Sequence, residues 1–203
     1  MKGLAIVSVI FCAAVAHADP LGVGQTLFPA PAQPDPVGAT LVAGGVPLGF
    51  ASLNFSGTLT SSVLNNDASN PFGPNALTFT FLLANDGTST DPLERLTING
   101  YTGFATDASY QIPAAGIAPT LIDRLSADVT GFGFASFGPG RILPGQASAL
   151  LVLQTNATQY VNSFASVQDG TNASVATYSP APEPASLALM LVGLLAISRR
   201  RGK

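Results

Sequence analysis

The sequence is poor in the side chains that carry out most enzyme chemistry. Its 203 residues include one cysteine, one histidine and no tryptophan, and 9% of them are charged. Ordinary domains are about 25% charged. The only cysteine, Cys12, and the only histidine, His17, both lie near the N-terminus. Removal of the first 18 residues would leave a chain without either.

These absences exclude several classes of catalytic and structural site. Without histidine or cysteine the remaining chain has no Ser-His-Asp triad, thiol nucleophile, conventional zinc site or disulfide. Lysine occurs only at Lys2 and Lys203, so no central lysine forms a Schiff base. A pair of carboxylates or an all-oxygen calcium site is still compatible with the composition. We therefore expect a protein that is not an enzyme, with no catalytic residue, cofactor or metal.

Basic residues are scarce in the central part of the chain. Of the eight Lys and Arg residues, only Arg95, Arg124 and Arg141 lie away from the two ends, and the whole chain has a net charge of −3. Nucleic-acid binding needs a basic patch, so no nucleic-acid partner is expected. We expect the three arginines to neutralise nearby acidic side chains.

The N-terminus has the pattern of a secretory signal peptide. Lys2 supplies a positive charge, residues 4–15 are apolar, and Ala16-His17-Ala18 has the small-x-small form of a cleavage site. The pattern predicts a signal helix within residues 1–18, export by the secretion machinery, and cleavage between Ala18 and Asp19. A lipoprotein site at Cys12 is excluded because the preceding Phe11 is large.

The C-terminus combines three features. Pro182-Glu183-Pro184 is expected to be stiff and extended. The uncharged run 185–198 follows, and Arg199, Arg200, Arg201 and Lys203 close the chain. As a helix the run would span about 21 Å, less than the roughly 30 Å of a hydrocarbon core. Its terminal position and the basic tail 199–203 nevertheless favour a transmembrane helix with a cytoplasmic C-terminus.

This composite at residues 180–203 resembles the PEP-CTERM sorting signal of exported bacterial proteins. The resemblance implies that exosortase, a membrane-bound processing enzyme, acts at Pro182-Glu183-Pro184. It also implies a Gram-negative source, export across the inner membrane, transient anchoring and a final location on the cell surface or outside the cell. The family is associated with exopolysaccharide and biofilm. The alternative is an ordinary tail anchor that is never removed.

The central region is expected to be all-β. Residues 19–47 are rich in Pro and Gly and predict a mostly irregular arm with one short edge strand near 40–43. Polar and apolar residues then alternate in 51–63 and 77–83, which predicts strands with one buried face. Gly57 suggests a bulge in the first of these strands. A further strand is expected over 125–137, with Leu125 facing inward and a change of face at Gly131 that turns Phe132 and Phe134 to the core. A central strand is expected over 147–153, and a hairpin around Asp169-Gly170. Residues 48–179 therefore predict a single antiparallel β-sandwich, Ig-like or jelly-roll-like.

Few residues of this domain are candidates for binding. Residues 85–91, Asn-Asp-Gly-Thr-Ser-Thr-Asp, offer alternating oxygen ligands for calcium, although a polar hairpin turn explains them equally well. Asn65-Asn66-Asp67 is a weaker candidate of the same kind. Tyr101 and Tyr110 are candidates for stacking on a sugar, whereas the phenylalanines are expected in the core.

The leading hypothesis is an exported, non-enzymatic protein of the cell surface or extracellular matrix that is processed at its C-terminal motif. One alternative is a carbohydrate- or calcium-binding β-sandwich. Another is a glycosidase with two carboxylates across a cleft, although no motif around Asp107, Asp123 or Asp128 demands it.

Overall fold

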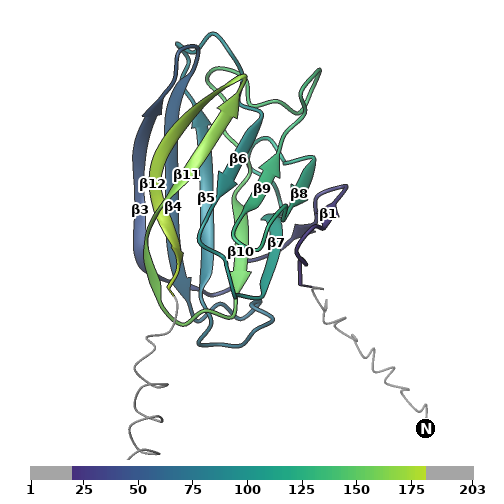
Figure 1. Cartoon of the computed structure of the whole chain (residues 1–203), viewed down its shortest axis with the longest axis vertical. Helices are drawn as coiled ribbons and strands as arrows, with labels where there is room; N and C mark the ends of the chain where they lie inside the picture. The colour runs from purple at the N-terminus through teal and green to yellow at the C-terminus, as the bar shows by residue number, and fades with distance from the viewer. Residues whose placement is uncertain (1–19, 182–203) are drawn as a thin grey trace, which may run out of the picture.

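The computed structural model describes residues 20–181, which form two facing β-sheets (Figure 1). The predicted signal helix and the predicted transmembrane helix near 185–198 lie outside the described residues. Within 20–181, no helix is both long and apolar enough to cross a membrane.

Each sheet has six strands. The strands are β1 (Thr26–Leu27), β2 (Ala32–Gln33), β3 (Thr40–Ala51), β4 (Ser56–Asn65), β5 (Thr78–Asn85), β6 (Arg95–Ile98), β7 (Thr106–Gln111), β8 (Leu121–Asp123), β9 (Thr130–Gly133), β10 (Leu151–Thr155), β11 (Tyr160–Asp169) and β12 (Thr171–Pro180). The first sheet has the order β1-β8-β9-β6-β11-β12, and the second has the order β2-β7-β10-β5-β4-β3. All pairs are antiparallel except β2 with β7.

The core lies between the two sheets and is built by alternation along each strand. The second sheet contributes Leu59, Phe79 and Leu153, and the first contributes Leu96 and Phe132, all fully buried. Burying one such side chain stabilises the fold by about 1.5–3 kcal/mol. In β4 the buried residues alternate with half-buried ones, so the pattern that predicts this strand also places one of its faces against the core.

The expectation of an all-β chain is confirmed for the described residues. The alternating segment at 77–83 lies in β5, and the turn after Asp169 joins β11 to β12. The central strand predicted over 147–153 is β10, which begins later, at Leu151, and ends at Thr155. It pairs with β5 on one side and β7 on the other, and all of its residues are buried, as a central strand requires.

The single long strand predicted over 51–63 is wrong. The chain turns at residues 52–55, between β3 and β4, and Leu53 at this turn is 87% exposed. A bulge at Gly57 is not observed; the irregularities of the β3–β4 pair lie in β3, between Leu41 and Ala43 and between Gly44 and Pro47. At Gly57 a Cβ would instead lie 2.1 Å from the Ala84 carbonyl oxygen, so glycine is needed there for close backbone approach.

The N-terminal arm is mostly irregular up to residue 39, as predicted, and the edge strand expected near 40–43 is the start of β3, which continues to Ala51. Within the arm, β1 pairs with β8 in one sheet, and β2 pairs with β7 in the other. β3 begins at Thr40, so the predicted domain boundary at residue 48 falls inside a strand. β1 and β2 are edge strands of two residues each, which is too short for any alternation to reveal them.

The strand predicted over 125–137 is also wrong. Only β9 lies in this range, and Leu125, predicted to face inward, is 64% exposed. The preceding residue, Arg124, is buried, and its hydrogen bonds are described below. Phe132 and Phe134 are buried, as the alternation after Gly131 predicts.

Candidate functional site

The folded domain continues to the residue directly before the predicted sorting motif. β12 ends at Pro180, and Ala181 is still buried. The backbone N–H of Ala181 donates a hydrogen bond of 2.9 Å to the carbonyl oxygen of Gln159. The described chain therefore leaves the domain at the lower end of β12, with no linker before Pro182 (Figure 1).

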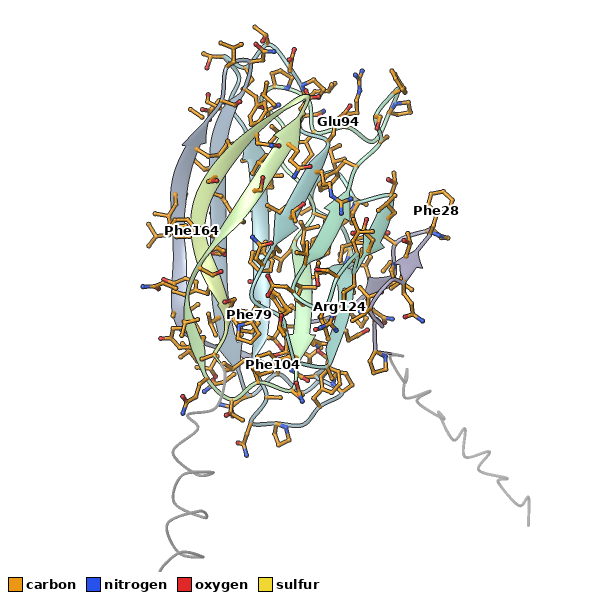
Figure 2. All side chains as sticks on the ribbon, in the orientation of Figure 1. Phe28, Phe79, Glu94, Phe104, Arg124 and Phe164 are labelled. Carbon is orange, nitrogen blue, oxygen red and sulfur yellow. The ribbon has the colours of Figure 1, made fainter. Side chains whose placement is uncertain are left out.

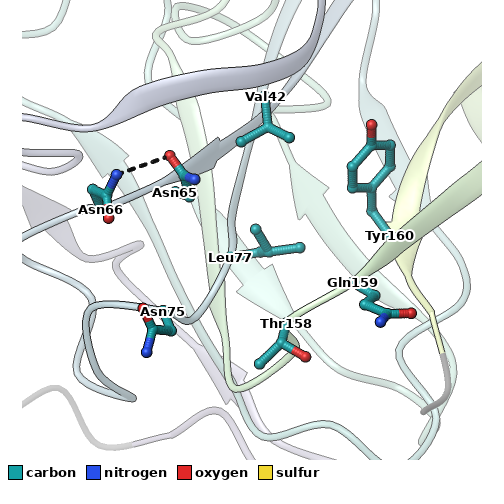
Figure 3. A pocket seen from close by; sticks show the side chains of 8 residues that line it. All are labelled: Val42, Asn65, Asn66, Asn75, Leu77, Thr158, Gln159 and Tyr160. Atoms are coloured by element: carbon teal, nitrogen blue, oxygen red, sulfur yellow. Dashed lines mark hydrogen bonds between the residues drawn. The ribbon is translucent and has the colours of Figure 1, made fainter.

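A cavity of about 370 Å³ lies at this exit. It is formed by strand ends and loops that meet at the same end of the sandwich (Figure 3). Its lining residues are Val42, Asn65, Asn66, Asn75, Leu77, Thr158, Gln159 and Tyr160. Gln159 belongs both to this cavity and to the hydrogen bond that holds Ala181.

The lining of this exit cavity is polar but uncharged. Leu77 is buried, whereas Asn66, Asn75 and Gln159 are exposed. The Asn66 side-chain amide donates to the Asn65 side-chain oxygen at 3.3 Å. With no ionisable group except the phenol of Tyr160 in the lining, the cavity is suited to binding and lacks the carboxylate or imidazole expected for acid–base catalysis.

One buried carboxylate fixes the loop that carries Asn65 and Asn66. Asp67 accepts hydrogen bonds from the backbone of Val37, the backbone and hydroxyl of Ser69, the hydroxyl of Thr78 and the amide of Gln154. Burial acts to raise the pKa of Asp67, but the hydrogen bonds from these groups outweigh it and lower the pKa. The sequence suggested Asp67 as a weak calcium-ligand candidate. In the structure its carboxylate oxygens accept hydrogen bonds that hold this loop to its neighbours.

The loop at 85–91 uses its polar groups within the protein. The Asn85 amide donates to the carbonyl oxygens of Asp91 and Ile142. Ser56 donates its hydroxyl to the Asp86 carboxylate, and Ser89 and Thr90 donate theirs to backbone carbonyls of the β3–β4 turn region. Within 20–181 no group of three or more His, Cys, Asp or Glu side chains is arranged to hold a metal ion. The loop joins β5 in one sheet to β6 in the other, so it is not a hairpin turn.

Of the two tyrosines proposed for stacking, Tyr101 is not available at the surface and Tyr110 is partly exposed. Tyr101 is fully buried, with its ring edge-on to Phe79 at 6.0 Å, and Tyr110 packs partly against the core. Burial raises the pKa of the Tyr101 hydroxyl, which has no hydrogen-bond partner among the described residues. Sequence reasoning missed Tyr160 and Tyr178, whose rings meet edge-on at 5.7 Å beside the exit cavity.

The phenylalanines divide between core and surface. The buried ones are Phe50, Phe55, Phe79, Phe81, Phe132 and Phe134. Phe28, Phe137 and Phe164 are mainly exposed, contrary to the core placement that was expected for them (Phe28 and Phe164 are labelled in Figure 2).

The expectation that the arginines neutralise acids is confirmed for Arg95, which forms an ion pair with Asp123. It is wrong for Arg124. That buried guanidinium donates to the carbonyl oxygens of Leu21, Tyr101, Phe104 and Ala127 (Arg124 and Phe104 are labelled in Figure 2). Burial lowers the pKa of Arg124. Its hydrogen bonds connect the segments at residues 21, 101–104 and 124–127.

The structure brings together two acids that the sequence did not pair. Glu94 and Asp169 line a second cavity of about 270 Å³. Burial raises the pKa of both carboxyls. Repulsion from Asp169 raises the pKa of Glu94 further, and repulsion from Asp91 does the same for Asp169. The positive charge of Arg141 opposes the rise at both carboxyls. Arg141 therefore acts as the counter-charge of this acidic corner.

The three acids considered for a glycosidase have other environments. Asp123 pairs with Arg95, and Asp128 accepts hydrogen bonds from the Gly100 backbone and the Thr102 hydroxyl. Asp107 is buried on β7 and also interacts with other groups of the protein.

The predicted sorting residues Pro182, Glu183, Pro184, Arg199, Arg200 and Arg201, and the predicted cleavage residues Ala16, Ala18 and Asp19, lie outside the described residues.

Comparison with known families and proteins identifies the C-terminal segment alone. A family model described as the PEP-CTERM protein-sorting motif matches residues 180–202. No curated protein and no solved structure matches the chain. The match begins at Pro180, the last residue of β12, so motif and folded domain adjoin. The chain is thus a PEP-CTERM domain-containing protein, and its motif implies export, a transient C-terminal membrane anchor and sorting by exosortase in a Gram-negative bacterium.

Proposed function

We propose that this protein is a non-enzymatic component of the cell surface or extracellular matrix, which is processed at Pro182-Glu183-Pro184. In this proposal the sandwich at 20–181 is the part that remains after the signal peptide and the anchor have been removed, and it contributes to an exopolysaccharide-containing matrix or biofilm.

The motif match at residues 180–202 is the main observation that supports this proposal. The fold supports the proposal because Ala181 is hydrogen-bonded to Gln159 and both sheets are formed by strands within residues 20–181. The scarcity of histidine, cysteine and lysine supports a role without catalysis.

Replacing Pro182, Glu183 and Pro184 by alanine tests the processing step. The expected result in the native host is a precursor that keeps its C-terminus and stays in the membrane fraction. The control is Pro139→Ala, which removes a proline from an exposed loop far from the motif along the chain and should leave processing unchanged. Normal processing of the triple-alanine variant would contradict the proposal.

A further inference from the structure

We propose that the exit cavity binds one neutral sugar unit of a glycan. The proposed function gives the destination of the protein, and this inference adds a ligand class and a site that the motif match does not supply.

The hydrogen-bonding groups of the cavity suit a polyhydroxylated ligand. Asn65, Asn66, Asn75 and Gln159 carry side-chain amides, each of which both donates and accepts hydrogen bonds. A sugar hydroxyl also does both, so the two kinds of group are complementary. Within the described part of the chain, the one side-chain hydrogen bond that joins lining residues is between Asn66 and Asn65. Most of the amide groups thus remain free to meet a ligand.

The apolar groups of the cavity suit the C–H face of a sugar ring. Leu77 and Val42 supply aliphatic surface, and Tyr160 supplies an aromatic ring with a polar end. Figure 3 shows Tyr160 and Val42 on one side of the cavity and Asn75 and Thr158 on another. Tyr178 packs against the Tyr160 ring at 5.7 Å, which restrains the ring before any ligand arrives.

The size and position of the cavity favour a unit within a longer chain. About 370 Å³ lies near the lower end of the usual 300–1,000 Å³ for small-ligand sites. The exposed Asn66, Asn75 and Gln159 leave the cavity open to solvent, so a polymer could continue beyond it. The lack of a basic group in the lining disfavours an acidic sugar.

The competing occupant is the protein's own Pro182-Glu183-Pro184 segment, which begins one residue after Ala181. Its prolines could contact Tyr160, but Glu183 would enter a cavity whose lining has no cation. A carboxylate finds no ion pair there, whereas the amides of the lining can both donate to and accept from sugar hydroxyls. The neutral lining therefore favours a sugar over this segment.

Saturation-transfer NMR on the full-length protein, in a detergent without a sugar headgroup, tests the proposal. The probes are cello-, malto-, manno- and chitohexaose, with hexagalacturonate as the acidic comparison and a peptide of residues 180–187 as the competing occupant. We expect saturation transfer to at least one neutral hexamer and weaker transfer to hexagalacturonate.

Two variants locate the binding. Asn66 has a φ of 54°, which glycine adopts without strain, so Asn66→Gly removes an amide and preserves the backbone. Tyr160→Ser removes the ring, and Tyr160→Phe keeps it. We expect Asn66→Gly and Tyr160→Ser to weaken binding about tenfold, as the loss of one contact typically does. Tyr160→Phe should retain most of the binding, and Asn172→Ala, at the far end of the β11–β12 hairpin, should retain all of it.

Three results would overturn the proposal: no transfer to any neutral hexamer, equal binding by wild type and both weakening variants, or binding of the peptide in place of every sugar. None of these results bears on processing at the motif, so failure here is distinguishable from failure of the proposed function.

Discussion

The backbone N–H of Ala181 donates to the carbonyl oxygen of Gln159 at 2.9 Å, and the residue after Ala181 is the first proline of Pro182-Glu183-Pro184. Residues 179 and 180 are paired with β11. A processing enzyme that binds its substrate as an extended strand therefore has little free chain on the N-terminal side of the motif.

We predict that a four-residue Gly-Ser insertion between Ala181 and Pro182 accelerates processing. The insertion supplies free chain without changing the motif or the paired residues. Pulse-chase labelling followed by immunoprecipitation measures the rate. The same insertion between Gly138 and Pro139, in an exposed loop, is the control and should have no effect. Equal rates for the wild type and the motif-side insertion would show that the closed end of β12 does not limit the enzyme.

Arg124 is expected to be a major contributor to stability. Its guanidinium donates to four backbone carbonyls, and removing it leaves buried acceptors without a donor. We expect Arg124→Met to lower the free energy of unfolding by roughly 3 kcal/mol, measured by urea denaturation. Arg141→Met, in the half-buried acidic corner, is the matched control and should cost less than about 1 kcal/mol. Similar losses for the two variants would contradict the assignment.

Substitutions at Gly44 and Gly38 distinguish the cost of a strained backbone conformation from the cost of a steric clash. Both have a positive φ, 83° and 65°. A Cβ at Gly44 would lie 2.1 Å from the Ser61 carbonyl oxygen, whereas a Cβ at Gly38 would meet nothing within 4 Å. We expect Gly38→Ala to cost about 1–2 kcal/mol and Gly44→Ala to cost clearly more, because β3 must move away from β4. Equal costs in thermal unfolding would show that the close approach at Gly44 is unimportant.

Asp67 and Asp35 should affect the pH dependence of stability in opposite ways. The folded pKa of Asp67 is lowered, so its stabilising effect is present above the unfolded pKa and is lost as the pH falls through the folded pKa. Burial raises the pKa of Asp35, and Asp67 adds repulsion while the Ser109 hydroxyl opposes the rise. Ionised Asp35 therefore destabilises the fold at neutral pH, and this effect disappears as the pH falls below its unfolded pKa.

We accordingly expect Asp67→Asn to lower the melting temperature at pH 7 and to differ less from wild type near pH 3. Asp35→Asn should raise the melting temperature at pH 7, because the ionised carboxylate is gone and an oxygen can still accept from Ser109. That gain should vanish near pH 3. A gain for Asp35→Asn that persists unchanged in acid would refute the ionisation argument.

Strands with a long buried face could be predicted from sequence because alternation records which side meets the core, as in 77–83. The two-residue strands β1 and β2 could not, since their pairing depends on partners far along the chain. The role of Arg124 was hidden for the same reason: one of its acceptors, the Leu21 carbonyl, is 103 residues away. The exit cavity draws on several separate segments, and only the Asn65-Asn66-Asp67 run was noticed, as a weak calcium candidate. The sorting motif was recognisable because all of its features are contiguous.

The central claim is that the sandwich is released from its anchor at the motif that follows it. Mass spectrometry of both termini of the protein recovered from its native host tests this most directly. We expect a chain that begins at Asp19 and ends within or next to Pro182-Glu183-Pro184. A chain that retains Arg199, Arg200 and Arg201 would show that the C-terminal segment is a permanent anchor and would contradict the account.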